Sequence, residues 1–131
     1  MTILLVDDSR FLRITNEKAL QKAGYDVIGA GDGEEALKIA REKLPNLIVL
    51  DMMLPKLSGP EVLKALRKDA STSKIPVMVL TSLPQSNEGK LKQEGATEYF
   101  AKSSLALDKS PERLVQAISK MLIKTRAATA Q

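Results

Sequence analysis

Short apolar runs alternate along this chain with longer stretches in which apolar residues recur at helical spacing. The runs have the length of β-strands, and strands separated by helices pair in parallel within one sheet. The pattern predicts an α/β fold: a doubly wound, five-stranded parallel sheet with helices on both faces. The predicted strands are Ile3–Asp7, Asp26–Ala30, Leu47–Asp51, Pro76–Thr81 and Glu98–Lys102. The second and fifth are the more polar, as expected of edge strands.

The stretches between the strands predict helices. Leu44 continues the apolar repeat of Ala36, Leu37 and Ala40, so we expect it to share their buried face. The predicted helices are Ser9–Ala23, one that includes Ala36–Leu44, one that opens at Gly59, Gln85–Glu94 and one from Ser110 to Lys124. The helix over Gln85–Glu94 has the weakest pattern and is expected to be the most mobile.

A chain of 131 residues suits one domain, which we expect over residues 1–124. The tail Thr125–Gln131 has no apolar face and is expected to fray. No apolar run is long enough to span a bilayer, and the start of the chain lacks the features of a signal peptide. The expected location is therefore the cytoplasm, with no membrane contact.

The chain contains no Cys and no His. Disulfides, thiolate or imidazole metal sites and histidine-based acid–base catalysis are therefore excluded. A metal site has to consist of oxygen ligands, which favours Mg²⁺ or Ca²⁺ over Zn²⁺.

The net charge of +4 is spread over helical segments, and only two Tyr and two Phe are available to stack on bases. Direct binding of nucleic acid is therefore not expected.

Charged or hydroxyl side chains follow four of the five predicted strands. Asp7 and Asp8 end the first, Asp51 the third, Thr81 the fourth and Lys102 the fifth. In a doubly wound sheet, functional groups gather beyond the carboxyl ends of the strands. Each residue alone has an ordinary explanation, such as a helix N-cap for Asp8 or a solvated end for Lys102. The combination indicates a functional site.

Three carboxylates that lie close together repel one another unless a cation is bound between them. Mg²⁺ prefers such oxygens and also accepts phosphate oxygens. Asp51 can then act as a nucleophile that forms an acyl phosphate, with Lys102 as a charge clamp and Thr81 as a hydroxyl donor.

Four motifs carry a resemblance to a known family. They are Ile3-Leu4-Leu5-Val6-Asp7-Asp8, Leu50-Asp51-Met52-Met53-Leu54-Pro55 with Gly59, Val79-Leu80-Thr81-Ser82, and Gly95-Ala96 through Tyr99 to Lys102. With these motifs the chain resembles response-regulator receiver domains, such as the chemotaxis regulator, over residues 1–124. The resemblance implies a flavodoxin-like fold with strand order 2-1-3-4-5. It also implies Mg²⁺-dependent transfer of a phosphoryl group from a phosphohistidine to an aspartate in a two-component phosphorelay.

By this resemblance Asp51 is the phosphoacceptor, Asp8 a direct Mg²⁺ ligand and Asp7 a ligand through water. The backbone carbonyl of Met53 completes the protein's ligands.

Thr81 and Tyr99 match the switch pair of the family, in which the hydroxyl moves toward the phosphoryl group and the aromatic ring turns inward. Tyr99 alone also fits an aromatic residue packed on an edge strand.

The implied partners are a histidine kinase or phosphotransfer protein and a downstream protein target. The face formed by the fourth helix, fifth strand and last helix is the one that the family uses for homodimers or partners.

Two departures from the family concern loops. Ser103 follows Lys102 where the family usually has Pro, and the stretch Ser103–Lys109 is longer than usual, which predicts a distinctive partner surface. Met53 and Leu83 are apolar where polar residues assist hydrolysis of the acyl phosphate in the family. They predict a long-lived phosphorylated state, although both also fit simple packing at the rim.

Other protein classes fit less well. An aspartate-nucleophile phosphatase needs a second Asp at the position of Met53, and a flavodoxin-like carrier needs a phosphate-binding loop where Asp7 and Asp8 stand. We therefore expect no enzyme beyond one that catalyses its own phosphorylation and dephosphorylation. Two alternatives stay open: a phosphorylation-independent adaptor on a receiver scaffold, and the N-terminal receiver of a longer regulator.

Overall fold

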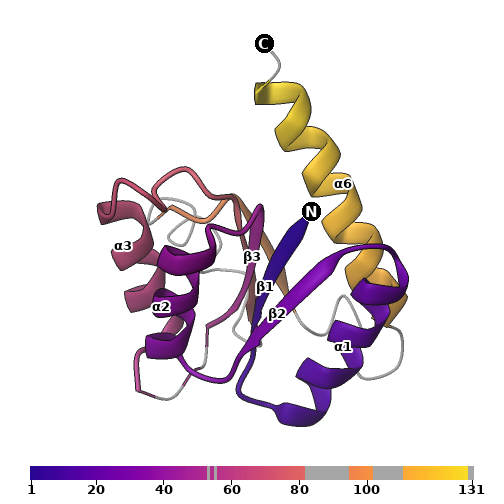
Figure 1. Cartoon of the computed structure of the whole chain (residues 1–131), viewed down its shortest axis with the longest axis horizontal. Coiled ribbons are helices and arrows are strands. Elements are labelled where there is room, and N and C mark those ends of the chain that lie inside the picture. Colours follow the sequence, from indigo (N-terminus) through magenta and orange to yellow (C-terminus); the bar gives the residue numbers. More distant parts are fainter. Residues whose placement is uncertain (53, 55, 82–94, 102–110, 130–131) are drawn as a thin grey trace.

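The computed structural model describes residues 1–52, 54, 56–81, 95–101 and 111–129, which form a sheet with helices on both faces (Figure 1). The strands are β1 (Thr2–Val6), β2 (Asp26–Ala30), β3 (Leu47–Asp51), β4 (Val77–Thr81) and β5 (Glu98–Ala101). The helices are α1 (Arg10–Lys22), α2 (Gly33–Lys43), α3 (Gly59–Lys68) and α6 (Pro111–Thr129). Helices α2 and α3 cover one face of the sheet, and α1 and α6 cover the other.

The sheet is entirely parallel and has the order β2-β1-β3-β4-β5. This confirms the predicted fold class and strand order, with β2 and β5 at the edges. The ends of each strand agree with the prediction to within one residue. The predicted helix over Gln85–Glu94 and the stretch Ser103–Lys109 lie outside the described residues.

Both faces of the central strands are buried, which explains their continuous apolar runs. On one face Leu4, Val6, Ile48 and Leu50 pack with the inner sides of α2 and α3. On the other, alternate residues of the same strands pack against residues of α1 and α6, among them Leu20, Leu114 and Ile118. Within the described part of the chain, no helix is long and apolar enough to cross a membrane.

One expectation about a helix end is corrected, and one helix extends past its predicted end. Leu44 is 52% exposed, because α2 ends at Lys43 and Leu44 adopts a left-handed conformation that turns its side chain from the core. At the other end of the chain, the helix predicted to end at Lys124 extends as α6 to Thr129. Fraying of the tail stays a prediction. Extending an existing helix fixes one residue for each new hydrogen bond, and alanines such as Ala127 and Ala128 have a high helix propensity.

Arg67 of α3 links this helix to the amino ends of β4 and β5 through hydrogen bonds. Its Nε and Nη2 donate to the carbonyl of Gly95 at 2.9 and 2.8 Å, and its Nη1 donates to those of Ser73 and Ile75 at 2.9 and 2.7 Å. Partial burial removes water from the guanidinium and lowers the pKa of Arg67 from its usual value. The bonds to three carbonyls compensate for this lost hydration.

Replacing Arg67 with Met should lower the free energy of unfolding by about 2–4 kcal/mol, since charge-assisted bonds are lost and carbonyls are left without a donor. Urea denaturation followed by circular dichroism measures the change. Lys64→Met is the matched control, because Lys64 is an exposed cation on the same helix. The control should stay within about 0.5 kcal/mol of the wild type. Equal stability of both variants would contradict the role given to Arg67.

Candidate functional site

The pairing of β1 with β3 brings two carboxylates to the same level of the sheet. Val6 lies opposite Leu50, so Asp7, which directly follows β1, comes next to Asp51, the last residue of β3. The carboxyl ends of parallel strands meet at one edge, where doubly wound folds gather functional groups. The register of the sheet therefore places these two residues side by side, whatever conformation each side chain adopts.

Asp7, Asp8 and Asp51 form one cluster at this edge. One carboxylate oxygen from each lies within 4.8 Å of the other two. Asp7 and Asp51 are each only 3% exposed, whereas Asp8 is exposed to solvent. The prediction that these three residues come together is confirmed.

The connection from β1 to α1 orients Asp7 through the backbone. The amide of Ser9 donates to Asp7 Oδ1 at 2.9 Å, which closes a tight turn around Asp8. Ser9 is also the N-cap of α1, because its Oγ accepts from the amide of Leu12 at 3.4 Å. Asp8 is therefore not the N-cap, and the ordinary explanation considered for it from the sequence is wrong.

Gly59 allows the connection from β3 to α3 to pass close to Asp51. Its amide donates to the carbonyl of Met52 at 3.1 Å. A Cβ at this position would lie 2.5 Å from the Cα of Met52 and 2.8 Å from the carbonyl oxygen of Asp51. Any larger residue would push the connection away from the strand end, so glycine is required by this close approach.

The carboxylate cluster suits a hard divalent cation. It offers only oxygen donors, two of them from buried groups, and a cation would offset their mutual repulsion. An exposed Asp8 beside buried Asp7 and Asp51 leaves one side of the cluster accessible from solvent. The cluster can therefore hold a metal ion and still admit a small anionic group.

The other predicted site residues are placed less completely. Thr81 ends β4 beside Ala101 of β5, and Tyr99 lies opposite Val79, but the side chains of Thr81 and Tyr99 are not described. The predicted residues Met53, Leu83 and Lys102 lie outside the described residues. Their roles remain predictions.

Sequence reasoning missed Arg13. Its Nη1 donates to the carbonyl oxygen of Asp7 at 2.6 Å, which ties α1 to the backbone beside the carboxylates. The only sequence signal is a basic residue one turn into the helix that follows the acidic pair, and such residues are usually solvated.

Comparison with known proteins agrees with this geometry. A family model described as "Response regulator receiver domain" matches residues 3–119. The chain is 46% identical over 101 residues to the alkaline phosphatase synthesis transcriptional regulatory protein PhoP of Bacillus subtilis, a match that covers 76% of this chain and 41% of PhoP. It is 35% identical over 101 residues to protein PilH of Pseudomonas aeruginosa, covering 76% of this chain and 84% of PilH.

Among solved structures, chemotaxis protein CheY4 of Vibrio cholerae superposes with a TM-score of 0.80 at 32% identity, covering 91% of this chain and 96% of CheY4. The chain spans less than half the length of PhoP, so what PhoP does as a whole is not transferred to it. The family match extends over both paired strands that carry the carboxylates and over the helices that support them. The chain belongs to the response-regulator receiver-domain family of two-component signalling.

Proposed function

We propose that Asp51 accepts a phosphoryl group from a phosphohistidine of a histidine kinase or phosphotransfer protein, and that the transfer requires Mg²⁺. The observation that carries the proposal is the cluster of Asp7, Asp8 and Asp51, whose carboxylate oxygens lie within 4.8 Å of one another at the carboxyl edge. Asp8 would bind Mg²⁺ directly and Asp7 through water, with Asp51 and the carbonyl of Met53 as the remaining protein ligands. Residues 1–124 would form the receiver.

The chemistry needs a nucleophile and a clamp on the phosphoryl group. A carboxylate oxygen of Asp51 attacks phosphorus, and the new P–O bond forms as the P–N bond to the donor imidazole breaks. The imidazole nitrogen keeps the electron pair and takes up a proton. Bound Mg²⁺ would offset the negative charge shared by the carboxylates and the phosphoryl oxygens. Lys102 would bind a phosphoryl oxygen as a point charge.

The acyl phosphate at Asp51 carries a charge of about −2 in place of the single negative charge of the carboxylate, and this change biases the switch pair. Thr81 would donate its hydroxyl to a phosphoryl oxygen, and Tyr99 would turn into the space that it leaves. Support comes from the sheet, since Thr81 and Tyr99 lie on neighbouring strands β4 and β5, with Thr81 opposite Ala101. The reaction would take place in the cytoplasm, and the output would pass through protein contact.

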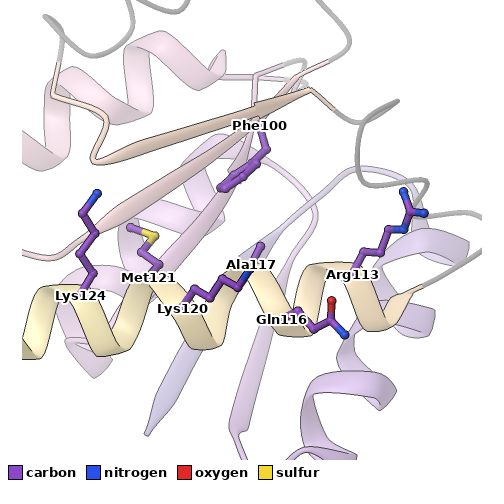
Figure 2. Close-up of a pocket in the computed structure, with 7 residues that line it drawn as sticks. All are labelled: Phe100, Arg113, Gln116, Ala117, Lys120, Met121 and Lys124. Atoms are coloured by element: carbon purple, nitrogen blue, oxygen red, sulfur yellow. The ribbon is translucent and has the colours of Figure 1, made fainter.

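We also propose a place for that contact. A groove of about 440 Å³ runs between β5 and α6 (Figure 2). Its apolar floor consists of Phe100, Ala117 and Met121, and its lining includes the cations Arg113, Lys120 and Lys124 together with Gln116. We place the partner surface here, with a downstream protein or a second copy of this chain as the occupant.

The charges of this groove decide between those occupants. Two copies joined across it by a twofold axis would bring Lys120 of each copy toward the other, whereas an acidic, partly apolar segment would complement Lys120. We therefore favour a downstream target with acidic side chains over a homodimer. A phosphorylation-independent adaptor would use the same groove without any change at Asp51.

Treatment with acetyl phosphate and Mg²⁺ should add the mass of one phosphoryl group to the wild type, because the acyl phosphate forms at Asp51. Asp51→Asn lacks the nucleophile and should gain nothing. Asp26→Asn is the control, since Asp26 is an exposed carboxylate at the opposite end of a strand. Intact-mass spectrometry measures both. A wild type that never gains mass would favour the adaptor.

Phosphorylated wild-type protein should lose its label slowly, because Met53 and Leu83 cannot orient an attacking water. Met53→Asn should shorten the lifetime by about tenfold, less than a general acid or base contributes, because an amide only orients the water. The decay of label from purified phosphoprotein with Mg²⁺ gives both lifetimes. Decay of the wild type as fast as in rapid chemotaxis regulators would contradict the prediction.

Self-association of beryllofluoride-treated protein should be weak at low salt and should tighten as salt screens the groove cations. Lys120→Glu should tighten it further, by removing one repulsion, whereas Lys64→Glu on α3 should not. Sedimentation equilibrium gives the association constants. Tight dimers at low salt that Lys120→Glu weakens would show that the groove binds a second copy through complementary charges.

A further inference from the structure

The side chain of Arg13 donates a hydrogen bond to the main chain of the β1–α1 connection, although Arg13 lies beyond the helix N-cap, Ser9. Arg13 lies in the second turn of α1, and its side chain is only 21% exposed. Its Nη1 donates to the carbonyl oxygen of Asp7 at 2.6 Å. A charged donor at this distance makes one of the stronger hydrogen bonds available to a protein.

This bond completes the support of Asp7. The Asp7 amide donates to the carbonyl of Ala30 at 3.1 Å, and Asp7 Oδ1 accepts from the Ser9 amide at 2.9 Å. Arg13 holds the remaining main-chain group, the carbonyl through which Asp7 is joined to Asp8. With the amide and the carbonyl both held, the direction of the chain between the two acids is fixed.

The neighbouring strand is shaped to leave room for this arginine. A Cβ at Gly31 would lie 3.2 Å from Arg13 Nη1, and one at Gly29 would lie 3.2 Å from Arg13 Cδ and would collide with the carboxylate of Glu17. Glu17 in turn lies 3.9 Å from Arg13 Nε, one helical turn along α1. The two glycines thus leave space for the arginine side chain, and together with the Glu17 carboxylate they direct its guanidinium toward Asp7.

We propose that Arg13 is a positioning residue for the metal-binding carboxylates: through the Asp7 carbonyl it fixes the backbone that aims Asp7 and Asp8. The inference rests on the metal site of the proposed function. Arg13 touches neither metal nor phosphoryl group in this role. It acts on geometry, as outer-sphere partners do at other metal sites, where their loss typically weakens metal binding or activity ten- to a hundredfold.

The positive charge of Arg13 has the opposite effect. A cation beside a carboxylate cluster repels Mg²⁺, so removal of charge alone would tighten metal binding. When Arg13 is replaced by a neutral residue, loss of the backbone support should weaken Mg²⁺ binding, whereas loss of the positive charge should strengthen it. This opposition makes the role of Arg13 measurable.

The test compares Arg13→Met with Arg10→Met in the full chain. Both variants lose one cation near the start of α1, but Arg10 is exposed and makes none of the described hydrogen bonds. Arg13→Lys keeps the charge, retains a stable helix and removes the planar guanidinium. Two quantities are measured by ¹⁵N NMR: the exchange rate of the Ser9 amide hydrogen without metal, and the dissociation constant of Mg²⁺ by titration.

Positioning predicts that Arg13→Met speeds exchange of the Ser9 amide and raises the Mg²⁺ dissociation constant by about tenfold, with Arg13→Lys shifted the same way. Arg10→Met should leave exchange unchanged and bind Mg²⁺ slightly more tightly. The proposal is overturned if Arg13→Met behaves as Arg10→Met does. If the wild type binds no Mg²⁺, the proposed function fails, and the role of Arg13 in fixing Asp7 is decided by the exchange rates alone.

Discussion

The parallel pairing of β1 with β3 places Asp7 beside Asp51, and the rest of the carboxyl edge is arranged around that pair. Both side chains are almost completely buried, with exposed Asp8 next to them, so their negative charges repel one another in a region of low dielectric. Such a cost is tolerated when the surrounding fold is held by other forces. Two apolar layers, one on each face of the same strands, supply them.

The residues that support the site bind main-chain groups more than side chains. Arg13 holds the carbonyl of Asp7, the amide of Gly59 binds the carbonyl of Met52, and Arg67 binds three carbonyls at the far ends of β4 and β5. The direction of a carboxylate depends first on the backbone that carries it. Fixing main-chain carbonyls and amides therefore preorganises the edge that carries the carboxylates.

The site and the groove between β5 and α6 are linked by the sheet. Asp51 lies opposite Leu80, next to Thr81, and β4 pairs with β5, whose Phe100 lines the groove. Under the proposed function, a change at the end of β3 would reach the groove through adjacent strands. Arg67 holds the amino ends of β4 and β5 through hydrogen bonds. Any movement of their carboxyl ends would therefore take place relative to amino ends that are held in position.

The sequence by itself determined the strands, their parallel arrangement and the meeting of Asp7, Asp8 and Asp51, because alternation of apolar runs with helical stretches leaves few ways to bury both sheet faces. The strand order came from family resemblance. The apolar and polar pattern does not match burial at two positions. Leu44 fits an apolar repeat yet is exposed, and Asn16 is polar yet only 1% exposed.

Tertiary structure alone decided which residues support the acids. Arg13 resembles any solvated helix cation in the sequence, and its role depends on the absence of side chains at Gly29 in β2 and at Gly31 just after it. Likewise, the partners of Arg67 follow it by as much as 28 residues. Hydrogen bonds of this kind depend on distances between elements, which the periodicity of one segment does not contain. Register and apolar pattern set where the acids meet, and packing set how they are held.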